Sequence, residues 1–329
     1  EFDAVDTGVF RCSLGLFDAL EAVYTTEGDA SLSQGVKNLA DQNRAHTVDV
    51  GDAWWQDVDD VLTRDEAERR LFASLTKESD GFISKQINRR ISKWISKRLM
   101  RTRVSPNHVT GAALVIGLMA VLCNLMVDAD HLWLVALGGV LFQFSSIVDG
   151  CDGELARLRF QFSEFGAWFD TISDVIINHS YLASLGFAVT QVTGEVVWAY
   201  ISALVLALSL IVLRNVTKSI SAKGETYLPA MDWSFKNEDD CQTLFQKICK
   251  NFAFFARRDF YAFVLMVLSF GGLIAMKFST ISSLIVVGFV FGQNLRTNMM
   301  MKRGTEQGYN QNFNPSTTGQ MPALSEQAA

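Results

Sequence analysis

Apolar residues dominate the chain between residues 107 and 300, where a few polar stretches interrupt them. A helix that crosses a lipid bilayer needs about 20 consecutive, mostly apolar residues. Six segments meet this requirement to within a few residues: 107–127, 131–150, 170–192, 195–213, 259–278 and 279–299. The pattern predicts an all-α polytopic membrane protein with six transmembrane helices.

The stretch over 82–104, just before the first apolar run, has a different pattern. Its apolar residues recur at helical spacing, and basic residues occupy the positions between them. This arrangement is typical of an amphipathic helix that lies on an anionic membrane surface. A linker helix packed on the N-terminal part of the chain is the alternative, and we favour the interfacial helix. Ser105 and Pro106 predict a break before the first span.

The first 75 residues are mixed and acidic, and their pattern indicates a separate soluble piece. Apolar positions between Phe10 and Val23 predict a helix that follows a strand. Alternation over 45–50 predicts a short strand, and residues 64–75 predict a closing helix. Such a piece is short for an independent core. Because the chain also begins without a methionine or a signal peptide, we expect it to lack the N-terminal portion of a longer protein.

Basic residues occupy some links between the predicted spans and are missing from others. Lys and Arg are absent near 128–130 and 193–194 but frequent before the first span, in 151–169, in 214–258 and after the last span. Links rich in Lys and Arg face the cytoplasm. With six spans, all basic links fall on one side. We therefore expect a multi-pass protein of the inner or plasma membrane with both termini cytoplasmic.

Composition excludes some classes of function. The 329-residue chain has a formal net charge of −6 and is 49% apolar. No basic surface dominates, which argues against nucleic-acid binding. The five cysteines form no CxxC pair, which argues against a zinc site or a disulfide framework.

Four carboxylates lie where the pattern predicts the cytoplasmic ends of spans: Asp149, Asp152, Asp170 and Asp174. A charged side chain at membrane depth costs a few kcal/mol even on insertion scales, so four together call for a physical reason. Spacings of three and four place each pair on one face of a helix. A divalent cation between the two faces would remove their repulsion. Oxygen-only ligands favour Mg²⁺, Mn²⁺ or Ca²⁺ over zinc.

The neighbours of these aspartates suit a phosphate-bearing substrate. Gly153 and Ala156 leave a surface without bulk, and the Arg157 guanidinium can make two hydrogen bonds to a phosphate. Solvated carboxylates at helix ends are the alternative without chemistry, and a catalytically inactive scaffold is another. A divalent-metal transporter would also carry acidic residues among its spans. We disfavour the transporter because it predicts carboxylates at mid-membrane, and because Arg157 would repel a cation.

The spacing Asp-x2-Asp-Gly-x2-Ala-Arg-x8-Gly-x3-Asp-x3-Asp resembles the signature of the CDP-alcohol phosphotransferases. All eight specified positions are present: Asp149, Asp152, Gly153, Ala156, Arg157, Gly166, Asp170 and Asp174. Pro106, Asn107 and Thr110 resemble the Pro-Asn-x-x-Thr that opens the first span of that family. The resemblance covers roughly residues 82–300, including six spans and a preceding interfacial helix.

The resemblance implies a role for each matched residue. Asp149, Asp152 and Asp170 would bind the metal, and Asp174 would share it and act as general base on the acceptor hydroxyl. Six residues would form the CDP site, either by contacting the CDP moiety or by letting the surrounding helices pack closely: Gly153, Ala156, Arg157, Gly166, Asn107 and Thr110. We expect Mg²⁺ or Mn²⁺ as cofactor, with two ions. The implied reaction moves a phosphoalcohol from a CDP-linked donor to an alcohol, releasing CMP, in a homodimer.

The N-terminal piece also resembles a known class. Residues 6–10 and 48–59 are similar to the C-terminal third of sugar-nucleotidyltransferase-like domains, in which Asp57 would be a metal ligand. A structural turn is the alternative for this short match. The order of domains resembles fused, bifunctional members of the family that make CDP-inositol and then transfer inositol phosphate. CDP-inositol is therefore the favoured donor; the alternative is a phospholipid synthase that uses CDP-diacylglycerol and inositol phosphate or another polar alcohol.

Four basic residues are candidates for binding a phosphorylated acceptor: Arg214, Lys218, Arg257 and Arg258. The alternative is that they serve membrane topology alone. We expect four parts in the chain: a truncated α/β cytidylyltransferase-like piece over 1–78, the interfacial helix over 82–104, the phosphotransferase membrane domain over 105–303 and a disordered tail over 304–329.

Overall fold

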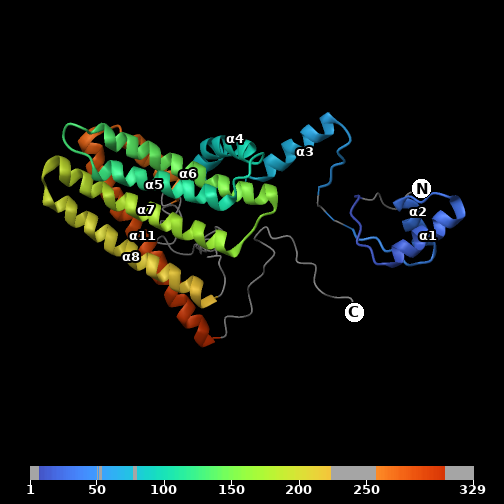
Figure 1. The fold of residues 1–329 in the computed structure, drawn as a ribbon. Coiled ribbons are helices and arrows are strands. Elements are labelled where there is room, and N and C mark those ends of the chain that lie inside the picture. The colour runs from blue at the N-terminus through green and yellow to red at the C-terminus, as the bar shows by residue number, and fades with distance from the viewer. Residues whose placement is uncertain (1–6, 50, 52–53, 77–79, 224–256, 308–329) are drawn as a thin grey trace. The chain divides into compact units, whose positions relative to one another are not determined.

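The computed structural model describes residues 7–49, 51, 54–76, 80–223 and 257–307 (Figure 1). The chain divides into two compact units, residues 1–73 and 74–329. All regular structure in the described residues is helical. The α/β character expected for the N-terminal piece is therefore not observed in the part of the chain that the structure describes.

The N-terminal unit contains three helices: α1 (Gly15–Glu27), α2 (Leu32–Asp41) and most of α3 (Val61–Ser74). Leu16, Ala19 and Val23 form the buried face of α1, which packs on α2. The short strand predicted over 45–50 is not formed by the described residues 45–49. A strand needs neighbours to be stable, and no other strand exists among the described residues to pair with it.

The second unit is a bundle of long helices that lie side by side (Figure 1). They are α5 (Pro106–Leu125), α6 (Trp133–Arg159), α7 (Glu164–Thr193), α8 (Val196–Lys223), α10 (Arg258–Leu268) and α11 (Gly272–Gln307). At the centre of the core, the rings of Phe142 and Tyr181 stack with centroids 3.9 Å apart. Within the described residues, five helices are long and apolar enough to cross a membrane: α5, α6, α7, α8 and α11.

The fifth predicted span, 259–278, is the exception. Its helix α10 has 11 residues, which corresponds to about 16 Å and is too short for a bilayer core of about 30 Å. The turn predicted at 278/279 instead lies at 269–271, before Gly272, whose φ of 66° suits glycine. The apolar run is continuous there, so hydropathy could not locate the turn. Residues 278–280, where the break was predicted, lie inside α11, and the Thr280 hydroxyl donates to the Met276 carbonyl one turn earlier.

Helices α6 and α7 are also longer than predicted, which leaves only residues 160–163 of the expected link 151–169 outside a helix. Phe160 ends α6 in a left-handed conformation, with φ 54°. Just before it, the Arg159 guanidinium donates to backbone carbonyls of the segment that follows α4, including that of Thr102. Ser163 then caps α7 by accepting from the Gly166 N–H at 3.0 Å. All four motif aspartates therefore lie on helices.

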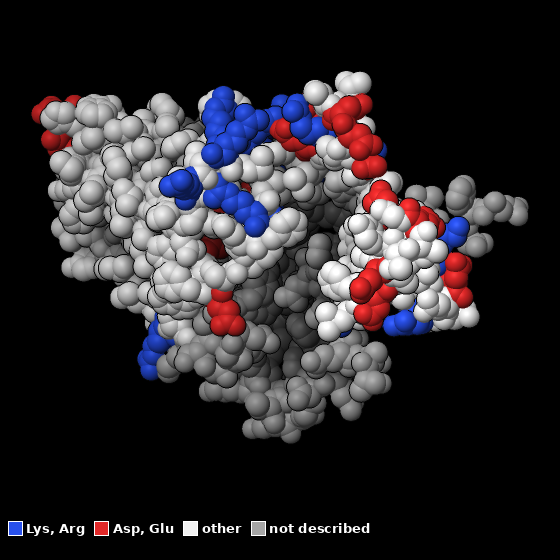
Figure 2. All heavy atoms as spheres, turned by 45° about the vertical axis from the view of Figure 1, so that its right-hand side comes forward, with Lys and Arg blue, Asp and Glu red and all other residues white. Residues whose placement is uncertain are grey.

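The predicted amphipathic segment forms a π-helical turn η1 (Ser84–Asn88) that continues into α4 (Arg89–Leu99). Ile95 and Leu99 pack against a buried cluster that includes Leu155 of α6. On the outer side, Trp94 is exposed and the Arg98 guanidinium lies 3.4 Å from its ring centroid. Figure 2 shows Lys and Arg side chains gathered over the region of α4. The helix and its basic face are as predicted, and its position on a membrane surface stays a prediction.

Candidate active site

Helices α6 and α7 bring three of the four motif aspartates together. One carboxylate oxygen each of Asp149, Asp170 and Asp174 lies within 4.8 Å of the other two. Asp149 comes from α6, whereas Asp170 and Asp174 lie one turn apart on α7. We call these three residues the acid cluster. Among the described residues, this is the one group of three or more His, Cys, Asp or Glu side chains with such geometry.

The acid cluster has the donor set and the unmet bonding capacity that a divalent cation requires. The Asp149 side chain is 18% exposed and that of Asp174 is 34% exposed. Oδ1 of Asp149 is fully buried and has no hydrogen-bond partner within the described ranges. A buried carboxylate oxygen in that state carries a large energetic cost, which coordination to a cation removes. Because all ligand atoms are oxygens, the residues present fit Mg²⁺ or Mn²⁺.

Asp152 lies outside the acid cluster, on the next turn of α6. Its carboxylate accepts a hydrogen bond of 2.6 Å from the Thr110 hydroxyl and another from the Gly153 N–H. The side chain is buried. Thr110 belongs to α5, so this helix fixes the orientation of Asp152. The structure thus places Thr110, expected at the nucleotide, in contact with a proposed metal ligand.

Arg258, the first residue of α10, reaches into the acid cluster. Its Nη1 donates to Asp149 Oδ2 at 3.0 Å and also to Asp174 Oδ1. Its Nε and Nη2 are buried and have no hydrogen-bond partner in the part of the chain that the structure describes. The guanidinium therefore neutralises part of the negative charge of the acid cluster, and two of its nitrogens remain able to donate hydrogen bonds to a ligand. The sequence suggested Arg258 as a basic group but could not indicate this contact, because Arg258 and Asp174 are 84 residues apart.

The other candidates for an acceptor phosphate lie elsewhere. Nε of Arg257 is 3.3 Å from Asp259 Oδ1, and Arg214 is exposed on α8. The side chain of Lys218 lies outside the described residues. Among the described side chains of this set, Arg258 is the one in contact with the acid cluster.

The small residues of the motif create the space and the close contacts expected of them. A Cβ at Gly153 would meet only Nη1 of Arg157, at 3.5 Å, and Nε of Arg157 is buried without a partner. Ala156 is half-buried on the same stretch of α6. At Gly166, a Cβ would lie 2.9 Å from Asn107 Oδ1. Gly166 therefore permits α7 to approach the first turn of α5 closely.

Asp57 lies in the N-terminal unit, where its side chain is exposed and Oδ1 accepts from the Val58 N–H at 3.0 Å. No metal-type cluster includes it among the described residues. Its role as a metal ligand stays a prediction.

Sequence reasoning missed two charged residues beside the acid cluster, Glu154 and Arg89. Glu154 lies between Asp152 and Arg157 on α6 and is completely buried. Arg89 is the first residue of α4. Burial of its guanidinium disfavours the charged form, but the hydrogen bonds and negative charges of Asp80 and Glu154 outweigh this effect and raise the pKa of Arg89 above its usual value. The signal that could have found them is the recurrence of Arg89, Ser92 and Ser96 on the inner face of α4.

Comparison with known proteins agrees with this geometry. The family model described as CDP-alcohol phosphatidyltransferase matches residues 103–301. Three similar curated proteins are each named "Bifunctional IPC transferase and DIPP synthase". The protein of Thermococcus kodakarensis is 34% identical over 214 residues, 64% of this chain and 46% of its own length. That of Archaeoglobus fulgidus is 35% identical over 211 residues, 61% of this chain and 40% of its own length.

The third relative, from Rubrobacter xylanophilus, is 38% identical over 181 residues, which cover 53% of this chain and 38% of that protein. The chain thus spans less than half the length of each of these three relatives. The family model covers more than half of the chain, within the unit that holds the apolar helices and the acid cluster. This membrane protein therefore belongs to the CDP-alcohol phosphatidyltransferase family of enzymes.

Proposed function

We propose that the second unit transfers a phosphoalcohol from a CDP-linked donor to the hydroxyl of an acceptor, forming a phosphodiester and releasing CMP. The observation that carries this proposal is the acid cluster, in which carboxylates from α6 and α7 converge beside a buried guanidinium. The family of the chain supports the same chemistry.

Each residue near the cluster has a task in this reaction. We assign Asp149, Asp152 and Asp170 to Mg²⁺ or Mn²⁺, with Asp174 near enough to share it. A bound cation would neutralise the pyrophosphate of the donor and the CMP that leaves. Arg157, whose buried Nε lacks a partner, would bind a donor phosphate.

Asp174 is the proposed general base. Its side chain is 34% exposed, against 18% for Asp149, so it is the more accessible of the two to an acceptor. The carboxylate takes the proton of the acceptor hydroxyl as the oxygen forms its bond to phosphorus. The bond between that phosphorus and the oxygen of CMP breaks, and CMP leaves with its electron pair.

Arg258 is the proposed partner of a phosphorylated acceptor. Nε and Nη2 have no hydrogen-bond partner among the described residues, and they belong to a group that already touches the proposed general base. A guanidinium in this state can bind a phosphate with two hydrogen bonds. An acceptor phosphate bound there would lie next to the carboxylate proposed to activate the acceptor hydroxyl. The curated relatives, by their names an IPC transferase and DIPP synthase, support CDP-inositol as donor and an inositol phosphate as acceptor.

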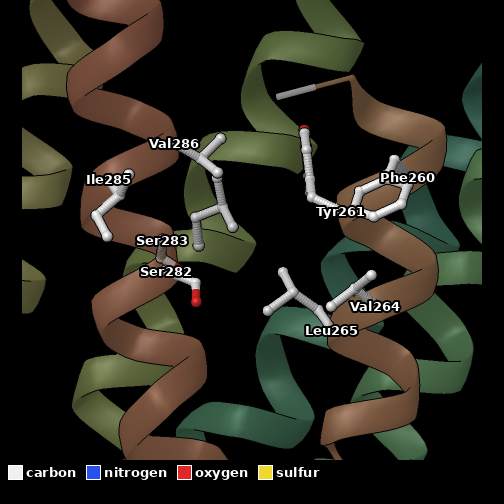
Figure 3. A pocket seen from close by; sticks show the side chains of 9 residues that line it. Phe260, Tyr261, Val264, Leu265, Ser282, Ser283, Ile285 and Val286 are labelled. Atoms are coloured by element: carbon white, nitrogen blue, oxygen red, sulfur yellow. The ribbon is translucent and has the colours of Figure 1, made fainter. Parts of the chain in front are cut away.

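A cavity favours a second candidate, a phospholipid synthase that uses CDP-diacylglycerol. About 210 Å³ of space lies between α7, α10 and α11, and Figure 3 shows Leu265 of α10 facing Ser282 of α11 across it. The lining is mainly apolar and includes Phe260 and Tyr261, which lie two and three positions after Arg258. An acyl chain suits this lining, whereas a sugar alcohol would leave its hydroxyl groups unpaired.

The proposal also covers the orientation of the enzyme in the membrane, its oligomeric state and the origin of its N-terminal piece. We place the acid cluster and both termini on the cytoplasmic side of the membrane, because the basic links fall there. Although α10 is short, Arg258 at its start lies at the acid cluster and Met276, just after the turn, packs with Val127 and Val189 at the other end of the bundle, so α11 returns toward the cytoplasmic side. We also propose a homodimer, and a cytidylyltransferase-like origin for residues 1–78. Protease protection in sealed vesicles tests the orientation, and analytical ultracentrifugation in detergent tests the dimer.

The purified protein should be incubated with Mg²⁺ and either CDP-inositol or CDP-diacylglycerol, across a panel of polar and phosphorylated alcohols. CMP release with CDP-inositol supports the first candidate, and release with CDP-diacylglycerol alone supports the second. A parallel reaction in EDTA is the control for metal dependence. CMP release from neither donor would refute both.

A further inference from the structure

Glu154 is a buried carboxylate that the proposed reaction does not use. It lies on α6, two residues after Asp152, and its exposed fraction is 0%. Oε1 accepts from Arg89 Nη1 at 2.8 Å and from the Ser92 hydroxyl at 2.7 Å. Oε2 accepts from the Ser96 hydroxyl at 2.7 Å. All three partners belong to α4, so the Glu154 carboxylate links three positions on the inner face of α4 to α6 by hydrogen bonds.

Arg89 extends this connection in two directions. Its Nε and Nη2 bind both carboxylate oxygens of Asp80, at 2.8 and 3.0 Å. Its Nη1, besides binding Glu154, lies 3.5 Å from the carbonyl oxygen of Gly150. Gly150 directly follows Asp149. Arg89 therefore contacts α6 within the turn that carries Asp149 and Asp152, at Gly150, and again just after that turn, at Glu154.

Apolar side chains packed in the same place would stabilise the fold about as well as this network of buried charges does. Replacing a buried ion pair with well-packed apolar side chains is often neutral or stabilising. What it does impose is register. A shift of α6 by one residue moves it about 1.5 Å along its axis and rotates it by about 100°, which would take Glu154 away from all three of its partners on α4.

We propose that Glu154 and Arg89 are positioning residues, which hold α6 at the rotation and height that bring Asp149 against Asp170 and Asp174. They touch neither substrate nor metal and act through Asp149 and Asp152. This inference rests on the proposed function in one respect, the assignment of Asp149 as a metal ligand. It adds that α4 sets the geometry of the metal site.

The test measures the affinity for Mn²⁺ by electron paramagnetic resonance, with the full chain in detergent and without substrate. Glu154→Gln keeps the shape of the side chain and removes its charge. Residues that orient metal ligands typically change metal affinity or activity by about 10- to 100-fold when replaced. We expect Glu154→Gln to weaken Mn²⁺ binding by about tenfold or more and to lower kcat, with a smaller change in the KM for the donor.

The double variant Arg89→Met/Glu154→Met separates positioning from stability. Asp80 loses its hydrogen bonds from Arg89 in both Arg89→Met and the double variant, whereas the Glu154 carboxylate loses its cationic partner only in Arg89→Met. The metal-free thermal midpoint of the double variant should therefore recover relative to Arg89→Met, while its Mn²⁺ affinity should stay low. Asp128→Asn, on an exposed loop, is the matched control and should bind Mn²⁺ like the wild type. If a single variant fails to fold, the double variant decides.

Two results overturn different claims. Wild-type affinity for Mn²⁺ and wild-type kcat in both the single and the double variant would show that the network is merely structural, and would overturn the positioning role. Failure of the wild-type protein itself to bind Mn²⁺ would instead overturn the metal assignment in the proposed function.

Discussion

Replacing Arg258 with glutamine should tighten the binding of a divalent cation to the acid cluster. Nη1 of Arg258 donates to both Asp149 and Asp174, which are two of the three carboxylates that a cation would use. A cation that binds Asp149 and Asp174 therefore competes with the guanidinium for these carboxylates, and we take the loss of one hydrogen bond as the cost of binding. Glutamine retains a polar side chain but removes the competing positive charge.

The magnitude follows from the bond that is given up. A hydrogen bond to a charged group contributes about 1.5–3 kcal/mol net. Each 1.4 kcal/mol corresponds to a tenfold change in affinity, so the loss of one such bond amounts to about 10- to 150-fold. The metal-free variant should be less stable by about 1.5–3 kcal/mol, because two partly buried carboxylates lose hydrogen bonds from a charged donor.

The assay is Mn²⁺ titration by calorimetry in detergent without substrate, accompanied by thermal unfolding with and without Mn²⁺. Arg257→Gln is the matched control, since Arg257 pairs with Asp259 and not with the acid cluster. We expect the tighter binding and the larger rise in unfolding midpoint on adding Mn²⁺ only in Arg258→Gln. Unchanged or weaker Mn²⁺ binding in that variant would refute the idea that the guanidinium and the cation compete.

Three further changes have defined outcomes. Asp174→Asn should still bind CDP with Mg²⁺ in an equilibrium assay but should lose about 10²- to 10⁴-fold in turnover, the usual contribution of a general base; full turnover would remove Asp174 from that role. Gly166→Ala should lower stability by about 1–3 kcal/mol in thermal unfolding, because its Cβ would lie 2.9 Å from a side-chain oxygen of α5. Gly288→Ala, where a Cβ meets nothing within 4 Å, should not do so, and equal losses would contradict the close approach. A hydrogen bond from Trp198 lowers the pKa of the Glu195 carboxyl, so Glu195→Gln should lower the thermal midpoint at neutral pH. The difference should shrink as the pH falls below the ordinary pKa of glutamate and through the lowered one, because the carboxylate protonates; a pH-independent difference would argue against this.

The motif was predictable because its chemistry is local in sequence. Spacings of three and four residues place Asp149 with Asp152, and Asp170 with Asp174, on two helix faces, and the structure brings three of these four together. The hydropathy pattern likewise indicated the five long apolar helices. What it could not locate was the turn before Gly272, since the apolar residues continue through it.

The rest of the site depends on contacts between distant segments. Arg258 reaches Asp174 across 84 positions, and Glu154 binds Ser96 across 58. Glu154 occupies an unspecified position of the motif, so spacing gave no reason to single it out. The end of α6 was missed for a similar reason: Arg159 binds carbonyls near Thr102, and no local pattern reveals that contact.

The most direct test of the central claim follows the phosphorus atoms themselves. Phosphorus nuclear magnetic resonance should be recorded on the purified protein with Mg²⁺, CDP-inositol and an inositol phosphate. The account predicts that CMP and a new phosphodiester appear together in equal amounts, and that neither appears in EDTA. Equal amounts of CMP and free inositol phosphate, with no phosphodiester, would mean hydrolysis and would contradict the account.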